Sequence, residues 1–282
     1  MSETLCSAAS LQQHLDDPHW LIVDCRFDLA DPAAGAAEYH RGHLPGAVYA
    51  HLDEQLSDHR QSGLGRHPLP NAEAFSATLS AWGLHADSQV VCLDHGSGAV
   101  AARLWWLLRS VGHAQVSVLD GGMAAWSRLG LPLTTALTAR PPTRYPVTFA
   151  NAKVVDYAEV AGARSAADRL LIDARAAERF AGQVEPIDPV AGHVPGAVNR
   201  PFQQNLDGNG GFKSAAALNH EFSTLLAGRD PERVIHMCGS GVTACHNLLA
   251  MERAGLTGSR LFAPSWSGWI SDPRQPVATG AA

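Results

Sequence analysis

The sequence predicts two similar α/β domains in tandem, each a mostly parallel sheet flanked by helices. The chain has 282 residues, more than a single domain usually holds. Its second half repeats the landmarks of the first half in the same order. In both halves, short runs rich in Val, Leu and Ile alternate with segments of helical periodicity. This alternation favours parallel strands covered by helices on both faces.

Four pairs of matched segments define the repeat. The run LIVDCRFD at residues 21–28 returns as LIDARAAE at 171–178, and GHLPGAV at 42–48 returns as GHVPGAV at 192–198. Two further pairs follow in the same order: residues 90–108 match 234–251, and LDGGMAAW at 119–126 matches FAPSWSGW at 262–269. The period is far longer than the roughly 20–50 residues of solenoid repeats, so it indicates a duplicated domain.

The repeat also predicts where the domains begin and end. We expect a first domain at residues 1–135 and a second at 153–282. Residues 136–152 between them are rich in proline and show little amphipathic period, which is typical of an extended linker.

Composition excludes several classes of protein. The hydrophobic fraction of 46% with 17% charged residues is that of a folded protein. The net charge is −6 and the basic residues are dispersed, so no nucleic-acid partner is expected. No run of 18 apolar residues and no targeting pattern is present, which predicts a cytoplasmic protein without a membrane partner. Five cysteines are too few for a disulfide scaffold.

Cys238 is the predicted nucleophile. It stands between an apolar strand and a helix, where ligands bind in parallel sheets, and the first half has Asp94 in its place. The first domain is therefore expected to be non-catalytic. A cysteine reacts as the thiolate, which needs stabilisation at neutral pH. We expect inward-pointing amides and the helix amino end to supply it, within the loop formed by Cys238, Gly239, Ser240, Gly241, Val242 and Thr243.

Three other interpretations of this segment are open. It could be a strand-to-helix turn with a buried cysteine, or a zinc site formed by Cys238, Cys245, His236 and His246, although their spacing fits no usual ligand pattern. A cysteine phosphatase would need an arginine six residues after the nucleophile, where this chain has Ala244. Cys245 itself is expected either in the helix core or as a regulatory partner of Cys238.

These residues resemble the rhodanese superfamily, and the loop CGSGVTA resembles in particular that of the mercaptopyruvate sulfurtransferases. The resemblance spans essentially the whole chain and implies two rhodanese-like domains, of which only the second is catalytic. It also implies the reaction: Cys238 takes sulfur from 3-mercaptopyruvate, releases pyruvate, and passes the sulfur of a cysteine persulfide to cyanide or to a thiol such as thioredoxin. No cofactor and no metal is expected.

The resemblance further implies a set of site residues. Cys238 matches the nucleophile, and Ser240, His67 and Asp53 match a relay in which Asp53 orients His67. This relay requires residues of the first domain to serve the second. Outside such a relay, His67 and Asp53 would be ordinary surface polar groups.

Substrate binding is expected at the loop and at an arginine. Arg179 matches a residue that binds the substrate carboxylate, a role suited to a bidentate guanidinium. The alternative for Arg179 is a surface ion pair with Glu178 or Glu185. Where the family often has a second arginine, this chain has Ile187, and we hypothesise that Arg66 compensates. The loop residues Gly239, Gly241, Val242 and Thr243 complete the predicted binding site.

Two other functions compete with mercaptopyruvate sulfurtransfer. The same cysteine could carry out thiosulfate:cyanide sulfurtransfer, but thiosulfate-preferring members of the family tend to have cationic residues in the loop, and this loop is uncharged. Alternatively the protein could be a non-catalytic binding module, since the first domain shows that the scaffold exists without its thiol.

Overall fold

A computed structural model describes residues 4–164 and 166–280, which form two compact units. The first unit comprises the chain up to Asp58, together with Leu69–Ala150 and Gly208–Phe212. The second unit comprises the remainder, including His59–Pro68. One loop from each half of the sequence therefore belongs to the unit formed mainly by the other half. Residues 135–150 form no helix or strand.

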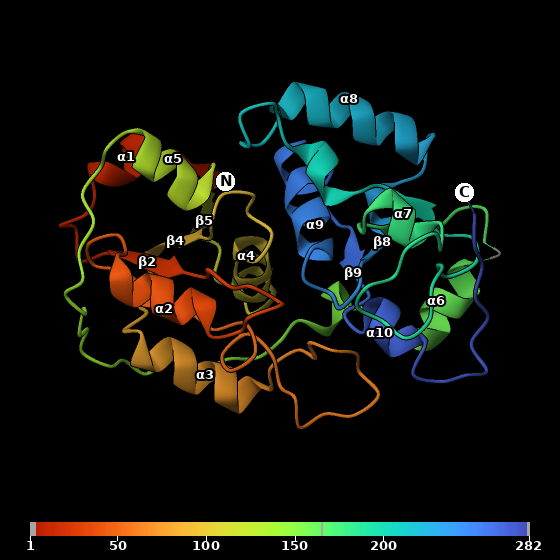
Figure 1. The fold of residues 1–282 in the computed structure, drawn as a ribbon, viewed down its shortest axis with the longest axis horizontal. Coiled ribbons are helices and arrows are strands. Elements are labelled where there is room, and N and C mark those ends of the chain that lie inside the picture. Colours follow the sequence, from red (N-terminus) through yellow and green to blue (C-terminus); the bar gives the residue numbers. More distant parts are fainter. Residues whose placement is uncertain (1–3, 165, 281–282) are drawn as a thin grey trace. The chain divides into compact units, whose positions relative to one another are not determined.

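The first unit is a five-stranded parallel sheet with helices on both sides (Figure 1). Its strands lie in the order β1-β5-β4-β2-β3, and Figure 1 shows α1 and α5 on one side and α2 and α3 on the other. The elements are β1 (Leu5–Cys6), α1 (Ala8–Gln12), β2 (Trp20–Asp24), α2 (Ala34–Arg41), β3 (Val48–Tyr49), α3 (Ala72–Ala81), β4 (Gln89–Leu93), α4 (Ala101–Ser110), β5 (Val116–Leu119) and α5 (Gly122–Arg128).

The second unit repeats this plan with a four-stranded parallel sheet in the order β7-β6-β8-β9. An isolated bridge from Val154 to Leu261 lies beside β9, where the first unit has β1. The elements are η1 (Asn151–Lys153), α6 (Tyr157–Ala163), β6 (Leu170–Asp173), α7 (Ala177–Phe180), β7 (Val198–Asn199), η2 (Phe202–Asn205), α8 (Ala215–Leu226), η3 (Pro231–Arg233), β8 (Val234–Met237), α9 (Ala244–Arg253), β9 (Arg260–Leu261) and α10 (Ser265–Trp269). The predicted fold class is confirmed.

The central strands are apolar because both of their faces are covered. β6 and β8 pair in register, with Leu171 beside Ile235 and Asp173 beside Met237, and β2 and β4 pair in the same way in the first unit. At the end of β6 the Asp173 carboxylate accepts a 2.7 Å hydrogen bond from Arg175, whose guanidinium also donates to the Gly192 carbonyl. The first unit repeats the pair with Asp24 and Arg26. This shared ion pair fixes the chain where each strand ends.

The matched histidines of the two halves hold matched turns. His43 Nδ1 is hydrogen-bonded to the Tyr39 carbonyl, and its ring stacks on that of Tyr39. His193 makes the same contacts with Phe180, at 2.8 Å to the carbonyl and 3.8 Å between ring centroids. Since both units use the histidine in this way, it serves the fold.

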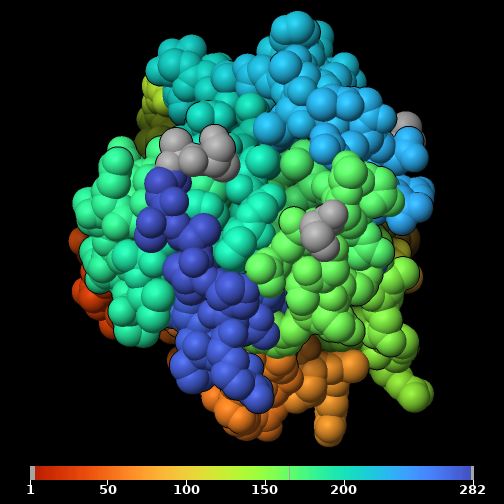
Figure 2. Space-filling model, turned by 90° about the vertical axis from the view of Figure 1, so that its right-hand side faces the viewer, coloured from red at the N-terminus to blue at the C-terminus, as the bar shows by residue number. Residues whose placement is uncertain are grey.

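The segment around Ala278 and Gly280 packs on the surface of the second unit. Ala278 forms an antiparallel bridge with His193, and Gly280 donates to the Ala181 carbonyl. Figure 2 shows this terminal segment, in blue, crossing the surface between segments coloured green. Among the described residues, no helix is long and apolar enough to cross a membrane.

Each unit has its own apolar core, built from strand residues and from tryptophans of the last helix. The core of the first unit includes Leu11, Ile22, Leu44, Val91, Leu93, Leu119 and Trp126. The core of the second unit includes Val160, Leu171, Phe180, Val194, Ile235, Met237, Phe262, Trp266 and Trp269.

His236, in the middle of β8, should make the second unit sensitive to acid. Burial, with the nearby Arg200 charge, lowers the pKa of His236 to about 3. The unfolded chain binds a proton there as the pH falls below about 6.5, whereas the folded chain does so only near 3, so stability is lost progressively across this window. In urea titrations at pH 7 and pH 5, His236→Leu should retain about 2 kcal/mol of unfolding free energy that the wild type loses.

His220 provides the matched control, because it is exposed on α8. The variant His220→Leu should lose stability between pH 7 and pH 5 as the wild type does. If His236→Leu also lost as much as the wild type, the buried neutral histidine would not be the source of the acid sensitivity.

Candidate functional site

Cys238 lies directly after β8, at the carboxyl end of a central strand. Its side chain sits in a loop of tightly turned backbone that leads into α9, and the Gly241 N–H donates a 3.1 Å hydrogen bond to Sγ. The residue is buried, with 2% of its surface exposed. The loop thus presents a main-chain donor to the sulfur, and the ten-residue helix α9 follows directly after the loop.

The amino end of α10 holds the outer side of this loop. Trp266 N–H donates to the Cys238 carbonyl and Ser267 N–H donates to the Gly239 carbonyl, both at 2.9 Å. Ser265 Oγ accepts from the Cys238 N–H at 3.1 Å and donates to the Phe262 carbonyl. With two of its carbonyls and the Cys238 N–H bonded outward in this way, the loop keeps the Gly241 N–H on the side of the sulfur.

Two residues take left-handed backbone conformations to make this arrangement possible. Gly241 has φ +79°, and a Cβ there would collide with the Ala263 carbonyl oxygen. Ser265 has φ +54° although it is not glycine, so it is held by its surroundings in a conformation that L residues rarely adopt. Ser265 could not be predicted from the sequence, because serine carries no signal for a left-handed conformation.

The equivalent loop of the first unit is built around a carboxylate. Asp94 Oδ1 accepts from the N–H groups of Gly96 and Gly98, at 3.0 and 2.9 Å. Asp94 Oδ2 accepts from Val100 at 2.9 Å and from Ala101 at 3.3 Å. Four main-chain N–H groups therefore bind the carboxylate of Asp94, which stands where the second unit has Cys238.

Ser240 and His67 are brought together in the second unit. His67 Nδ1 and Ser240 Oγ are 2.7 Å apart, and both residues are buried. His67 belongs to the segment His59–Pro68, which packs in this unit: Arg66 N–H donates to Ser267 Oγ, and Tyr157 Oη donates to the Gly63 carbonyl. A residue of the first half of the sequence thereby reaches the loop that begins at Cys238.

The third member of the expected relay, Asp53, lies in the first unit. It follows β3, and its N–H donates to His51 Nδ1 at 3.1 Å. Its role in orienting His67 stays a prediction.

Both predicted binding arginines lie at the loop. A Cβ placed on Gly239 would be 3.3 Å from Arg66 Nη2 and 3.7 Å from Arg179 Nη2. Arg179 is also paired with Glu185, as the alternative interpretation proposed, and with Asp188, but both acid side chains are only 3% exposed rather than on the surface. Asp188, which the sequence analysis missed, also binds Arg66 Nη1 at 2.6 Å.

The acids and arginines of this cluster alter one another's ionisation. Burial alone would raise the pKa of Glu185, but hydrogen bonds from Arg179 and from the N–H groups of Asp188 and Ile187 hold it below its ordinary value. Burial alone would lower the pKa of Arg175, but Asp173, Glu185 and Cys238 raise it. Arg175 therefore remains a cation near Cys238.

The remaining predicted loop residues have defined places. Val242 is buried, while Thr243 is partly exposed and occupies the N-cap of α9 without a side-chain cap bond. Cys245 is buried in α9, where Sγ donates to the Gly241 carbonyl at 3.3 Å. Burial raises the pKa of the Cys92 thiol and, with nearby acids and Cys92, that of Cys25. These two thiols are therefore poor nucleophiles.

The residues of the alternative zinc site have other partners. His236 Nε2 lies 3.1 Å from Met251 Sδ, and His246 Nδ1 is hydrogen-bonded to Asn205. Within residues 4–164 and 166–280, no group of three or more His, Cys, Asp or Glu side chains is arranged to hold a metal ion.

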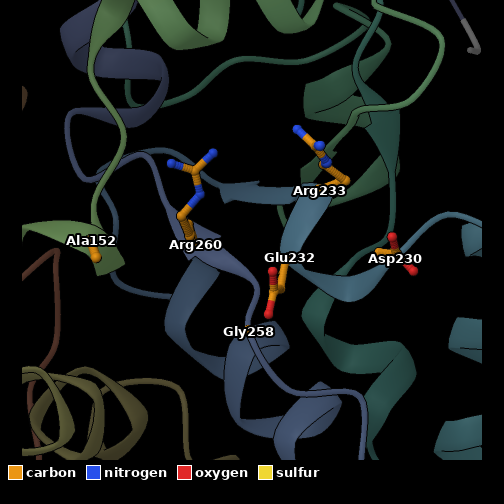
Figure 3. A pocket seen from close by; sticks show the side chains of 6 residues that line it. All are labelled: Ala152, Asp230, Glu232, Arg233, Gly258 and Arg260. Atoms are coloured by element: carbon orange, nitrogen blue, oxygen red, sulfur yellow. The ribbon is translucent and has the colours of Figure 1, made fainter.

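A polar pocket lies at the opposite end of β8 and β9 (Figure 3). Its arginines are paired with acids: Arg260 with Glu159 at 2.8 Å, and Arg233 with Asp168 at 3.7 Å. The pocket is lined by Ala152, Asp230, Glu232, Arg233, Gly258 and Arg260. It adjoins the amino ends of the strands, whereas parallel sheets bind their ligands at the carboxyl ends, where Cys238 lies.

Comparisons with known proteins agree with this description. Rhodanese-like domain models match residues 7–129 and 156–272. A Pseudomonas aeruginosa protein with the provisional name 3-mercaptopyruvate sulfurtransferase is 47% identical over 281 residues, 99% of each chain. A Mycobacterium tuberculosis protein with the provisional name thiosulfate sulfurtransferase is 41% identical, over 93% of this chain and 91% of its own length.

A solved structure extends the likeness to three dimensions. The crystal structure of the 3-mercaptopyruvate sulfurtransferase of Escherichia coli superposes with a TM-score of 0.82 and 33% identity, covering 94% of this chain and all of that one. The curated sequence from Escherichia coli is 36% identical over 95% of both chains. With both of its halves matched, the chain belongs to the rhodanese-like family.

Proposed function

We propose that this protein transfers sulfur from 3-mercaptopyruvate to a thiol or to cyanide through a persulfide on Cys238. The chain is a sulfurtransferase of the rhodanese-like family. The observation that carries the proposal is the 3.1 Å hydrogen bond from the Gly241 N–H to Cys238 Sγ, because it provides a main-chain donor for a sulfur anion. The related proteins of Pseudomonas aeruginosa and Escherichia coli, named for 3-mercaptopyruvate, support the choice of donor.

In the first half-reaction the Cys238 thiolate attacks the sulfur of the donor. An S–S bond forms, the C–S bond breaks, and its electron pair remains on the donor as the enolate of pyruvate. The thiol proton of the donor, or one from solvent, then protonates the carbon to give pyruvate. The Ser240–His67 hydrogen bond offers a path for this proton, and we propose that Asp53 orients His67.

The second half-reaction returns the enzyme to its starting state. An acceptor thiolate, or cyanide, attacks the outer sulfur of the persulfide, and Cys238 leaves as the thiolate. A protein thiol such as thioredoxin is our proposed acceptor, in the cytoplasm. The five cysteines, all within the described residues, form no disulfide, which suits a reducing compartment.

The carboxylate of the donor is assigned to the arginines at the loop. Arg179 and Arg66 lie over Gly239, next to the nucleophile, and a guanidinium can bind a carboxylate through two parallel hydrogen bonds. Gly239, Gly241, Val242 and Thr243 form the rest of the proposed binding site. The first unit has a carboxylate where the nucleophile would stand, and we assign it no sulfur transfer.

Incubation with 3-mercaptopyruvate, followed by intact mass spectrometry, tests the proposal directly. The wild type should gain one sulfur atom, about 32 Da, as a persulfide. Cys238→Ser should gain nothing, whereas Cys245→Ser should gain the same mass as the wild type because its sulfur lies in the helix. Absence of any gain with either 3-mercaptopyruvate or thiosulfate would refute sulfur transfer and favour a binding module.

Replacement of Arg179 tests the carboxylate site. Arg179→Ala should lower kcat/KM for 3-mercaptopyruvate by roughly tenfold to a hundredfold, mainly through KM, because a charge-assisted hydrogen bond contributes about 1.5–3 kcal/mol. The loss for thiosulfate, which has no carboxylate, should be smaller. Arg233→Ala, at the other end of β8, serves as the control. Equal losses of kcat/KM for both donors would show that Arg179 does not bind the substrate carboxylate. In the wild type, a higher kcat/KM for thiosulfate than for 3-mercaptopyruvate would identify thiosulfate as the donor.

Substitution of Gly241 tests the backbone of the loop. Gly241→Ala should lower the unfolding free energy by about 2–4 kcal/mol and slow sulfur loading, because the left-handed conformation and the collision with Ala263 both oppose a side chain. Gly255 has the same φ of +79°, but a Cβ placed there would have nothing within 4 Å. Gly255→Ala should therefore lose only about 1–2 kcal/mol. Equal losses would mean that the close approach at Ala263 does not matter.

A further inference from the structure

A buried carboxylate joins the two arginines of the proposed binding site. Asp188 Oδ1 accepts from Arg66 Nη1 at 2.6 Å, and Asp188 Oδ2 accepts from Arg179 Nη2 at 3.1 Å. The Asp188 side chain is 3% exposed, whereas those of Arg66 and Arg179 are 25% and 17% exposed. One acid therefore fixes the separation of two guanidiniums that come from distant parts of the sequence.

The other nitrogen atoms of these guanidiniums face the loop. Arg66 Nη2 and Arg179 Nη1 lie 3.3 and 3.8 Å from the position that a Cβ on Gly239 would occupy. In the described part of the chain, Arg66 Nε is buried without a hydrogen-bond partner. Guanidinium N–H groups that do not bind Asp188 therefore lie beside Gly239, the residue that follows Cys238.

The charges of this cluster cancel. Arg179 is also bound by Glu185, and Glu185 in turn contacts Arg175, which is paired with Asp173. The three cations are Arg66, Arg175 and Arg179, and the three anions are Asp173, Glu185 and Asp188. The site therefore offers directed N–H donors without a net positive charge, and Ile187 adds no further cation next to Asp188.

We propose that Asp188 determines donor specificity by making this site suited to a singly charged carboxylate and unfavourable for a dianion. A monoanion gains hydrogen bonds from the two guanidiniums, while a second negative charge meets the Asp188 carboxylate without a compensating cation. At neutral pH 3-mercaptopyruvate carries one carboxylate charge and thiosulfate carries two charges. The inference rests on the proposed sulfurtransferase function and names the residue that sets its substrate class.

Steady-state kinetics of Asp188→Asn with both donors test this role. The variant keeps the size of the side chain and removes one negative charge, so kcat/KM for thiosulfate relative to 3-mercaptopyruvate should rise about tenfold. Asp168→Asn makes the same change of charge in the exposed pair with Arg233 and should leave the ratio as in the wild type. A ratio that stays the same or falls in Asp188→Asn would overturn the inference.

A binding measurement separates this inference from the proposed reaction. Sulfate, a dianion, and acetate, a monoanion, are used to protect Cys238 from alkylation by iodoacetamide, with the labelled residue identified by peptide mass. In Asp188→Asn the sulfate concentration for half protection should fall about tenfold relative to that of acetate. If no donor loads sulfur on Cys238 but this shift occurs, the proposed sulfur transfer is wrong and the selection of monoanions by Asp188 is supported. If sulfur loads but the shift is absent, the proposed role of Asp188 is wrong.

A second variant guards against misfolding of Asp188→Asn. Asp188→Glu keeps the negative charge between the two arginines, so the concentrations of sulfate and of acetate for half protection should keep the wild-type ratio. Structural damage would weaken protection by both anions. A shift that occurs in Asp188→Asn but not in Asp188→Glu therefore supports the role of Asp188, and the same shift in both variants refutes it.

Discussion

The site depends on a tightly turned loop at the carboxyl end of a central parallel strand, whose backbone N–H groups point at the side chain that begins it. In the first unit four amides bind the two oxygens of Asp94. In the second unit the Gly241 amide points at Cys238 Sγ, and α10 binds the loop's carbonyls from outside. A buried anion without donors is strongly destabilised, so this loop conformation has to be held firmly in either unit. The left-handed conformations of Gly241 and Ser265 follow from that requirement.

The fold could be predicted from the sequence because duplication repeats the same physical pattern. The apolar runs that form β2, β4, β6 and β8 are buried on both faces, so their sequences are nearly continuously hydrophobic. The matched His-Pro-Gly turns and the Asp–Arg pairs after β2 and β6 recur because each unit must fix the same strand ends. What the repeat could not reveal is that residues 59–68 belong to the second unit. That packing depends on Tyr157 and Ser267, which are distant in sequence and have no counterpart pattern.

The candidate site could be predicted where a residue type indicates its chemistry, but not where the backbone and distant contacts decide the role. A cysteine in a glycine-rich segment between strand and helix indicates a candidate nucleophile, and an arginine near it indicates a candidate carboxylate ligand. Ser265 offers no such signal, because its hydroxyl matters only through a left-handed turn. Asp188 gives no signal by itself either. Ile187 beside it stands where the family often has a second arginine, and in the structure the neighbouring Asp188 joins Arg66 to Arg179.

Charge balance explains how three arginines can lie so close to a nucleophilic sulfur. Buried ion pairs contribute little net stability, because desolvation offsets their attraction, so this cluster is better explained by what it orients than by what it stabilises. Its three cations are matched by Asp173, Glu185 and Asp188, so the cations near Cys238 are already paired, and the Gly241 amide is the donor that reaches Sγ. An amide can stabilise a sulfur anion without forming a tight ion pair with it. In the proposed reaction the sulfur therefore stays available for attack, while the guanidiniums keep their remaining N–H groups for the substrate.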